Sequence, residues 1–407
     1  MSSLIERFFR YVQIDTQSSE TSQSAPSTDK QFNLARQLEK ELHELGLQEV
    51  ELDKFCNLTA VLPANIEKKA PVIGFMAHLD TSPDVSGENV HPRLIEAYDG
   101  STIVLNKEKN ILFSPEDFPV LKNYVGQSLI VTDGTTLLGG DDKAGIAEIM
   151  AAMEYLTQHP EAKHGTIKVA FTPDEEVGRG MDHFDARKFG TDFAYTVDGE
   201  ELGELNYETF NAASAHIVIN GKQVHPGTAK NIMKNALLIA MELNAMLPPN
   251  ERPEHTEKRE GFYHLHQLGG DVEKAEMVYI IRDHNRQKFE HKKALIQQAA
   301  DFINSRYGAG TATCDVTDTY YNLKEKIDPV FHIIETAQKA MRAVGVEPKI
   351  IAVRGGTDGS RLSYMGIPTP NLFTGDFNAH SRFEFMSVPA MEKATEVILK
   401  IIELYAA

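Results

Sequence analysis

Apolar runs of strand length recur through the first half of the chain, and several of them show no alternation of apolar and polar residues. The runs are LTAVL (58–62), PVIGFMAH (71–78), SLIVT (128–132), TIKVAFT (166–172) and FAYTV (193–197). Strands that are covered on both faces of a sheet have this pattern. A helical stretch, KAGIAEIMAAMEYL, lies between two of the runs. The pattern therefore predicts an α/β layer built around a largely parallel sheet.

The order of the expected elements changes near residue 209. From there the sequence predicts strand, helix, strand, strand, helix and strand, the βαββαβ order of a ferredoxin-like unit. These elements are expected at 212–221, 228–246, 261–268, 274–283, 286–306 and 311–320. The αβ pattern then returns. Since 407 residues suffice for two domains, we expect a first domain at 1–208 and 323–407, with an α+β domain inserted at 209–322.

Charge and cysteine content restrict the partners and the compartment. The formal net charge of -18 argues against nucleic acid or an anionic membrane, which would require a basic face. The two cysteines, Cys56 and Cys314, lie far apart in the sequence, and their number predicts a reducing compartment without a disulfide framework. The first residues lack the unbroken apolar core of a signal peptide, and no stretch approaches the roughly 20 apolar residues of a membrane span. We therefore expect a cytoplasmic protein.

Acidic and imidazole side chains follow several of the apolar runs. They are His78, Asp80, Asp141, Asp142, Glu175, Glu176, Asp198 and His380. In an open α/β sheet, ligands bind outside the carboxyl ends of the strands. We therefore expect five separate segments to deliver these groups to one rim of the sheet.

These residue types suit a hydrolytic site with two metal ions. Imidazole nitrogen and carboxylate oxygen bind zinc, and a bridging carboxylate can hold two ions roughly 3.5–4 Å apart. A carboxylate that is not a ligand must then move the proton of the attacking water. The adjacent Glu175 and Glu176 can divide these tasks, since neighbouring side chains point in different directions. The two-residue spacing of His78 and Asp80 puts both on one face of a strand, where Asp80 can orient His78.

Several motifs carry a resemblance to a known family. They are HLDTSPD, LLGGDDKAGIAEIM, AFTPDEEVGRG, YTVDG, VHPGTAK, RGGTDG and NLFTG with a later histidine. Together, over residues 2 to 404, the chain resembles the tripeptide aminopeptidases of the two-zinc metallopeptidase family that also contains carboxypeptidases, dipeptidases and aminoacylases. The resemblance implies a zinc hydrolase that removes the N-terminal residue of short peptides such as tripeptides. It also implies that the inserted domain is a dimerisation or lid domain.

Carried over by position, the resemblance implies ligands for two Zn²⁺ ions in each subunit. Asp141 would bridge the ions. His78 and Asp198 would complete the ligands of one ion, and Glu176 and His380 those of the other.

The resemblance also implies roles for residues that are not ligands. Glu175 would be the general base toward a metal-bridged hydroxide and then the acid, and Asp80 the partner of His78. In a homodimer, His225 would reach the site of the partner subunit and stabilise the oxyanion. Arg354 would bind the terminal carboxylate of the substrate through two hydrogen bonds.

The chain departs from the family pattern in three places, and two alternative functions remain open. Glu200 and Glu201 stand where glycine is more common in the family, and Ser381 stands where a glycine typically follows the histidine. Gly140 stands where alanine is common in the family, and we expect it to loosen the loop before Asp141. A related zinc dipeptidase, carboxypeptidase or N-acyl amino acid deacylase would use the same ligands. An inactive metal-binding scaffold would usually have lost the base or a ligand, whereas this chain retains Glu175 and all five expected ligands.

Overall fold

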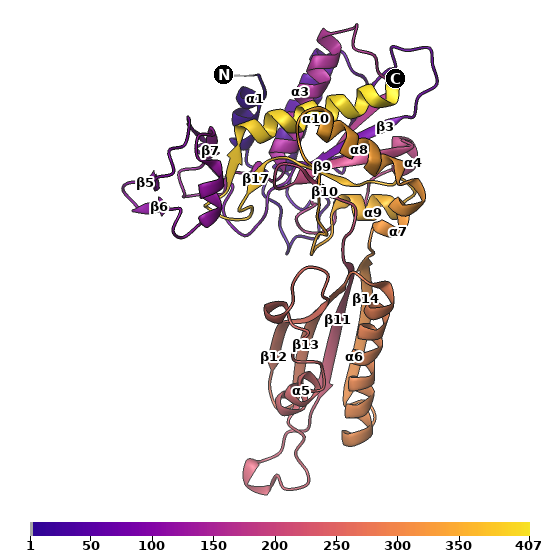
Figure 1. Cartoon of the computed structure of the whole chain (residues 1–407). Helices are drawn as coiled ribbons and strands as arrows, with labels where there is room; N and C mark the ends of the chain where they lie inside the picture. The colour runs from indigo at the N-terminus through magenta and orange to yellow at the C-terminus, as the bar shows by residue number, and fades with distance from the viewer. Residues whose placement is uncertain (1–2) are drawn as a thin grey trace. The chain divides into compact units, whose positions relative to one another are not determined.

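The computed structural model describes residues 3–407 and divides the chain into two compact units (Figure 1). The first unit comprises the residues up to Tyr207 together with Glu325–Ile351 and Thr357–Ala407. The second comprises Glu208–Lys324 and Ala352–Gly356. The short segment 352–356 thus belongs to the second unit, although the sequence analysis assigned it to the first domain. Among the described residues, no helix combines the length and the apolar character needed to cross a membrane.

A mixed eight-stranded sheet forms the core of the first unit, in the order β1-β2-β8-β3-β9-β16-β10-β15. The strands are β1 (Gln48–Leu52), β2 (Leu58–Leu62), β3 (Ile73–His78), β8 (Ile167–Thr172), β9 (Phe193–Gly199), β10 (Glu204–Asn206), β15 (Lys349–Ile350) and β16 (Asn371–Phe373). At its centre β8, β3, β9 and β16 run parallel to one another. Every residue of β3 is buried, as its unbroken apolar sequence predicts.

Helices cover both faces of this sheet. They are α1 (Ser3–Val12), α2 (Gln31–Glu44), α3 (Gly140–Gln158), α4 (Ala186–Phe189), α7 (Lys324–Ile327), η4 (Asp328–Val330), α8 (His332–Ala343), α9 (Asp358–Tyr364) and α10 (Val388–Ala406). On one face α3, α8 and α10 pack together, and the Tyr195 hydroxyl donates to the Ile333 carbonyl of α8. On the other face, Phe189 of α4 and Leu362 of α9 pack against Met76 of β3.

A smaller antiparallel sheet stands apart from the main sheet, in the order β17-β18-β7-β4. Its strands are β4 (Arg93–Ile95), β7 (Leu129–Val131), β17 (Asp376–Phe377) and β18 (Phe385–Ser387), and beside it lie the hairpin β5 (Ile103–Asn106) and β6 (Ile111–Phe113) and the turn η1 (Pro119–Tyr124). The run SLIVT therefore does not join the main sheet. It packs instead into a separate aromatic cluster that includes Phe113, Tyr124, Phe377 and Phe385.

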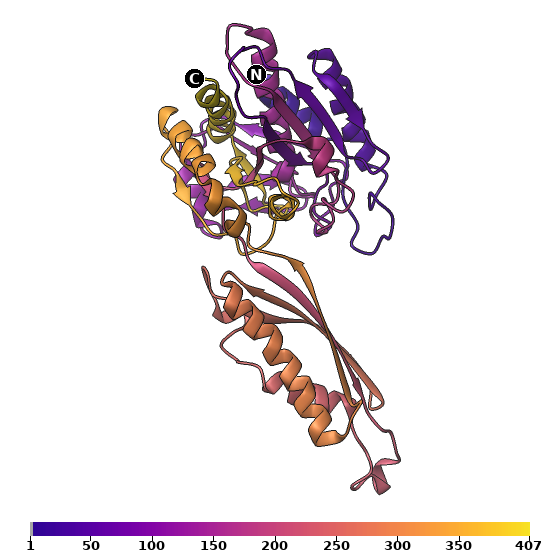
Figure 2. The same ribbon diagram turned by 90° about the vertical axis from the view of Figure 1, so that its right-hand side faces the viewer.

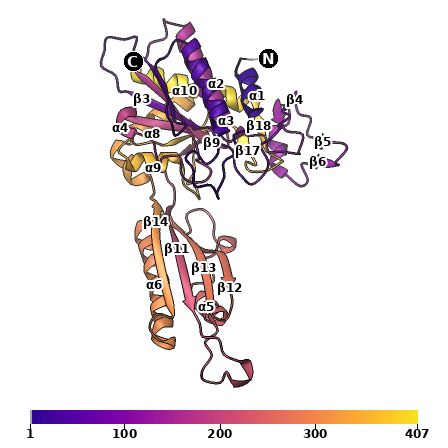
Figure 3. The same ribbon diagram turned by 180° about the vertical axis from the view of Figure 1, so that it is seen from behind.

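The second unit has the predicted βαββαβ order. Its elements are β11 (Asn211–Asn220), η2 (Pro226–Thr228), α5 (Ala236–Ala245), η3 (Pro253–His255), β12 (Phe262–Gly270), β13 (Lys274–Asp283), α6 (Arg286–Tyr307) and β14 (Ala312–Tyr320). Helices α5 and α6 pack on one apolar face of the sheet (Figure 2), and the strands follow the order β12-β13-β11-β14 (Figure 3). Helix α5 begins later than predicted because the Asn235 side chain accepts the N–H groups of Leu237 and Leu238 and so caps it.

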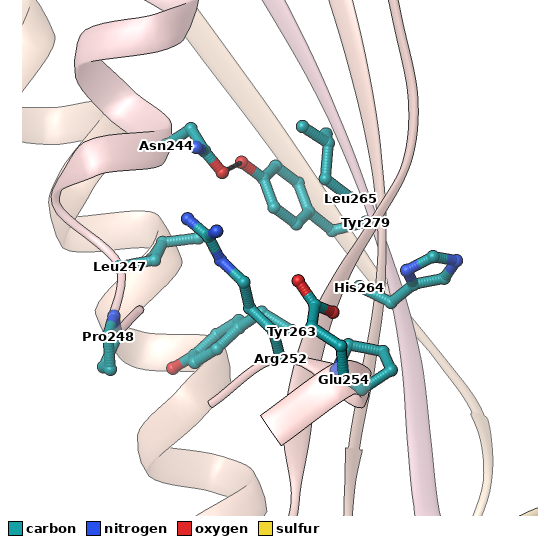
Figure 4. Close-up of a pocket in the computed structure, with 10 residues that line it drawn as sticks. Asn244, Leu247, Pro248, Arg252, Glu254, Tyr263, His264, Leu265 and Tyr279 are labelled. Atoms are coloured by element: carbon teal, nitrogen blue, oxygen red, sulfur yellow. Dashed lines mark hydrogen bonds between the residues drawn. The ribbon is translucent and has the colours of Figure 1, made fainter. Parts of the chain in front are cut away.

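A cavity of about 270 Å³ lies within the second unit, where the end of α5 and the following loop meet β12 and β13 (Figure 4). Its walls include Leu247, Tyr263 and Tyr279, and the Tyr279 hydroxyl donates to Asn244 Oδ1 at 3.0 Å. None of the side chains that the sequence analysis nominated as metal ligands lines this cavity.

Candidate metal centre

Two groups of three side chains share one carboxylate in the first unit. His78, Asp141 and Asp198 form the first group, and Asp141, Glu176 and His380 form the second. Within each group, one ligand atom of every residue lies within 4.8 Å of the others. The structure thus brings together the five residues that the sequence analysis nominated as ligands.

Asp141 presents one oxygen to each group. Its Oδ1 lies 2.8 Å from His78 Nε2, whereas its Oδ2 lies 3.3 Å from His380 Nε2. The other carboxylates complete the groups: Asp198 Oδ1 is 3.5 Å from His78 Nε2, and Glu176 Oε2 is 2.9 Å from His380 Nε2. A carboxylate in this position can bridge two cations, with one oxygen on each.

Parallel strands account for only part of this convergence. His78 is the last residue of β3, Asp198 lies near the end of β9, and Glu176 follows β8. Because these strands are parallel neighbours, their ends meet at one edge. Asp141 and His380 arrive differently: Asp141 lies at the start of α3, and His380 lies in the loop after β17 with a left-handed φ of 60°. The strand-end interpretation was therefore wrong for Asp141, because the strand before it, β7, belongs to the smaller sheet. His380 follows β16 of the main sheet, but β17 of the smaller sheet lies between them.

Buried side-chain acceptors fix the backbone of two candidate ligand residues. The N–H of His78 donates to Asp142 Oδ2 at 3.0 Å, and the N–H of Asp198 donates to Asn371 Oδ1 at 3.0 Å. Asp142 and Asn371 are themselves buried. A buried N–H needs an acceptor, so these two hydrogen bonds fix the backbone positions of His78 and Asp198 at the ends of their strands.

Asp80 makes two kinds of contact in the cluster. Its backbone carbonyl lies 3.0 Å from His78 Nδ1, and its Oδ1 lies 3.4 Å from the same nitrogen. Its carboxylate also accepts the N–H of Glu175 at 3.0 Å and that of Glu176 at 3.3 Å. With Nδ1 held in this way, Nε2 of His78 is the nitrogen that faces the cluster. The nearer partner of the imidazole is thus the backbone of Asp80, and its carboxylate orders the turn that carries both glutamates.

The imidazole of His380 has a more exposed setting. Its Nδ1 lies 3.3 Å from Asp84 Oδ2, and the two side chains are 40% and 64% exposed. The side chain of His78, by comparison, is 3% exposed. Asp84 closes the motif HLDTSPD but carried no role in the sequence analysis. The signal that points to it is its place in the same motif as His78 and Asp80.

Burial raises the pKa of three acids in the cluster, whereas for Asp141 hydrogen bonds with His380 and His78 outweigh burial and lower the pKa. Burial, with repulsion from Asp141, raises the pKa of Glu176 to about 8, and burial raises the pKa of Asp198 to about 6. Burial also raises the pKa of Glu175 well above its ordinary value. Hydrogen bonds with Asp141 and Glu176 raise the pKa of His380 to about 11. Repulsion from Asp141 contributes to the raised pKa of Glu176, and bound cations would offset that repulsion.

The donor set fits two zinc ions. Each group offers one imidazole nitrogen and carboxylates from two acids, which is a ligand combination that zinc accepts. Oε1 of Glu176 is buried and has no hydrogen-bond partner among the described residues. A buried oxygen of this kind is available to a cation.

Comparison with known proteins identifies the family. The model of Peptidase family M20/M25/M40 matches residues 134–404. Peptidase T of Alkaliphilus oremlandii is 60% identical to this chain over the full length of both proteins. The chain belongs to peptidase family M20/M25/M40.

Solved structures of M20/M25/M40 members have the same fold. The crystal structure of aminopeptidase PepT from Bacillus cereus is 25% identical, has a TM-score of 0.79, and matches 100% of this chain and 98% of that one. A dinuclear metal binding peptidase of the M20 family from Bacillus subtilis is similar in fold, with a TM-score of 0.66 at 15% identity, over 98% of this chain and 96% of that one.

Two residues to which the resemblance gave roles, His225 and Arg354, lie in the second unit. The side chain of His225 is exposed. Its Nδ1 accepts the N–H of Gly227 at 3.1 Å, so Nε2 is the nitrogen left for other contacts. The described residues of its own unit give Nε2 no hydrogen-bond partner.

Arg354 is held by a loop of its own unit. Its Nη1 donates to the carbonyl oxygens of Lys258 at 2.9 Å and Glu260 at 3.0 Å, and its Nη2 donates to Thr256 Oγ1 at 2.9 Å. Three of the five guanidinium hydrogens are used in these bonds. A two-pronged contact with a carboxylate would therefore have to use Nε and the remaining hydrogen of Nη2. Spacing in the sequence does not reveal these hydrogen bonds, because the acceptors lie almost a hundred positions away.

Proposed function

We propose that this chain is a two-zinc aminopeptidase that removes the N-terminal residue of short peptides, with tripeptides as its main substrates. One observation carries the proposal: Asp141 turns one oxygen toward each of two histidine–carboxylate groups. The full-length similarity to a Peptidase T supports the choice of an aminopeptidase among the members of the family.

Glu175 is the acid of the cluster best placed to move protons, because it belongs to neither ligand group. When bound, two zinc ions would lower the pKa of a shared water and polarise the peptide carbonyl. Glu175 would accept the proton of the attacking water and later donate it to the leaving amine. Its backbone is fixed by Asp80, whose carboxylate accepts the Glu175 N–H at 3.0 Å, and burial raises the pKa of its carboxyl.

The second unit is proposed to act as the lid and dimerisation domain. In a homodimer, His225 of one subunit would donate from Nε2 to the oxyanion in the site of the partner subunit. Arg354 would bind the substrate carboxylate through its Nε edge. Exposed apolar side chains on α5, Leu238 at 62% and Met241 at 59%, support an interface on this unit. Two free cysteines, Cys56 and Cys314, support a cytoplasmic location.

A peptide panel tests the substrate class. Zinc-loaded protein is incubated with di-, tri- and tetrapeptides that have free or acylated amino groups, and the products are identified by mass spectrometry. We expect free tripeptides to be cleaved fastest, with release of the N-terminal amino acid. Release of the C-terminal residue, or cleavage of acylated amino acids alone, would contradict the proposal.

The Glu175→Ala variant tests the assignment of the base. We expect it to bind two zinc ions and to lose kcat by about 10²–10⁴-fold, because the proton of the water has no acceptor. The exposed Glu116→Ala variant serves as the matched control and should keep wild-type kcat. Undiminished turnover by Glu175→Ala would refute its role.

A further inference from the structure

A carboxylate from the C-terminal part of the chain holds the loop that ends in the shared ligand. Glu384 is 1% exposed and lies between the loop of His380 and β18. Its Oε2 accepts the backbone N–H of Leu138 at 2.7 Å and that of Gly139 at 2.8 Å. Its Oε1 accepts the N–H of Asp141 at 3.1 Å. One side chain thus satisfies three backbone donors within four consecutive residues.

The local backbone explains why the loop needs this acceptor. Gly139 has a left-handed φ of 83°, and Asp141 has the non-helical angles φ -80° and ψ 104°. These residues lie at the start of α3, where N–H groups have no acceptor within the helix. A buried N–H without an acceptor is costly, and an ionised carboxylate is among the strongest acceptors available.

Gly140 allows the loop to approach this carboxylate closely. A Cβ atom at this position would lie 2.5 Å from Asp376 Oδ1, 2.6 Å from Met386 Sδ and 3.1 Å from Glu384 Oε1. The first two distances are too short for any side chain. The glycine therefore permits a close approach that a side chain at this position would block.

We propose that Glu384 is a positioning residue of the metal centre. By accepting three N–H groups of the loop, it sets the backbone of Asp141 so that one carboxylate oxygen faces each ligand group. The inference rests on the proposed function, because it assigns to Glu384 an effect on metal binding. His380 lies four positions before Glu384, so one short segment supplies a ligand of the second group and the anchor of the shared ligand.

Two variants of Glu384 and one control separate this role from simple packing. Glu384→Gln keeps one acceptor oxygen, but its NH₂ group must face at least one backbone N–H. Glu384→Ala removes all three acceptor contacts. Glu148→Gln is the matched control, because Glu148 is also a fully buried carboxyl yet no described residue hydrogen-bonds either oxygen.

Two measurements report separately on the hydrogen bonds of Glu384 to the loop and on zinc binding. Amide hydrogen exchange of the metal-free protein reports on the N–H groups of residues 138–141, and zinc titration of the same protein gives the dissociation constants. For Glu384→Gln we expect faster exchange in this loop and zinc binding about 10–100-fold weaker than wild type. Excess zinc should restore most of kcat, since the proton-moving group is intact. Glu384→Ala should bind zinc more weakly still. Glu148→Gln should match wild type in both hydrogen exchange and zinc affinity.

Wild-type zinc affinity and loop exchange in Glu384→Gln would overturn the proposal. The same holds if Glu384→Ala lowers only the melting temperature while each folded molecule binds zinc as wild type does. If Glu384→Ala fails to fold, the zinc affinity and loop exchange of Glu384→Gln alone test the proposal. Failure of the proposed function looks different, because the wild-type protein itself would then load no zinc or cleave no peptide.

Discussion

The two ligand groups share Asp141 but differ in how their histidines are held. His78 ends a fully buried strand, has a backbone carbonyl 3.0 Å from Nδ1, and is 3% exposed. His380 sits in a loop with a left-handed φ, has the exposed Asp84 beside Nδ1, and is 40% exposed. The first group is therefore organised before a metal binds, whereas the second can adjust or open. We expect the ion of the first group to be held more tightly.

The largest effect is expected where the two groups meet. Asp141→Asn replaces the shared carboxylate with a neutral amide that has a single acceptor oxygen. We expect loss of both ions and a fall in kcat/KM of at least about 10⁴-fold, because activation of the water and proton transfer both depend on the paired metals. Metal analysis and peptide hydrolysis give the two results. The exposed Asp99→Asn variant is the control. One tightly held ion in Asp141→Asn would show that the first group binds a metal without the shared carboxylate.

The next effect compares the histidines directly. His78→Ala should lose zinc that excess metal cannot restore, because the buried first group has no replacement donor. His380→Ala should lose only the ion of its own group, and added zinc should recover part of the activity because solvent can supply the missing ligand at this exposed position. Metal content after dialysis and kcat against added zinc measure the difference. If His380→Ala lost both ions and His78→Ala only one, the order of the two groups would be reversed.

The smallest effect concerns a buried carboxyl that holds neither a cation nor a backbone segment. Burial raises the pKa of Glu148 well above its ordinary value of 4.5. Above pH 4.5 the unfolded chain loses this proton while the folded chain keeps it, so the free energy of unfolding falls as pH rises, by up to about 1.4 kcal/mol per pH unit, until the folded pKa is reached. Glu148→Gln removes this loss. We expect urea unfolding to show that the free energy of unfolding of Glu148→Gln, relative to wild type, increases from pH 5 to pH 8. An equal difference at both pH values would contradict this.

Local sequence was sufficient for elements whose own residues decide their structure. Strand β13 occupies 274–283 as predicted, and α6 starts at residue 286 as predicted. Prediction was wrong where a specific contact decided the outcome. Asn235 moves the start of α5, and aromatic packing draws SLIVT into the smaller sheet. Neither the Asn235 cap nor the aromatic packing can be predicted from the periodicity of apolar residues.

The same division applies to the site. The acids and imidazoles at strand ends were visible, because parallel strands bring their ends together. Two of the groups that fix them were not visible. Asn371 and Glu384 accept N–H groups from residues that lie 173 or more positions away. A hydrogen bond between such distant segments depends on the finished fold, so spacing in the sequence cannot reveal it.

Anomalous diffraction at the zinc edge, from crystals of the zinc-loaded protein, tests most directly whether Asp141 joins two metal ions. We expect two peaks roughly 3.5–4 Å apart, one beside each oxygen of Asp141. His78 and Asp198 should surround one peak, and Glu176 and His380 the other. A single peak, or two peaks without Asp141 between them, would contradict the shared-carboxylate centre.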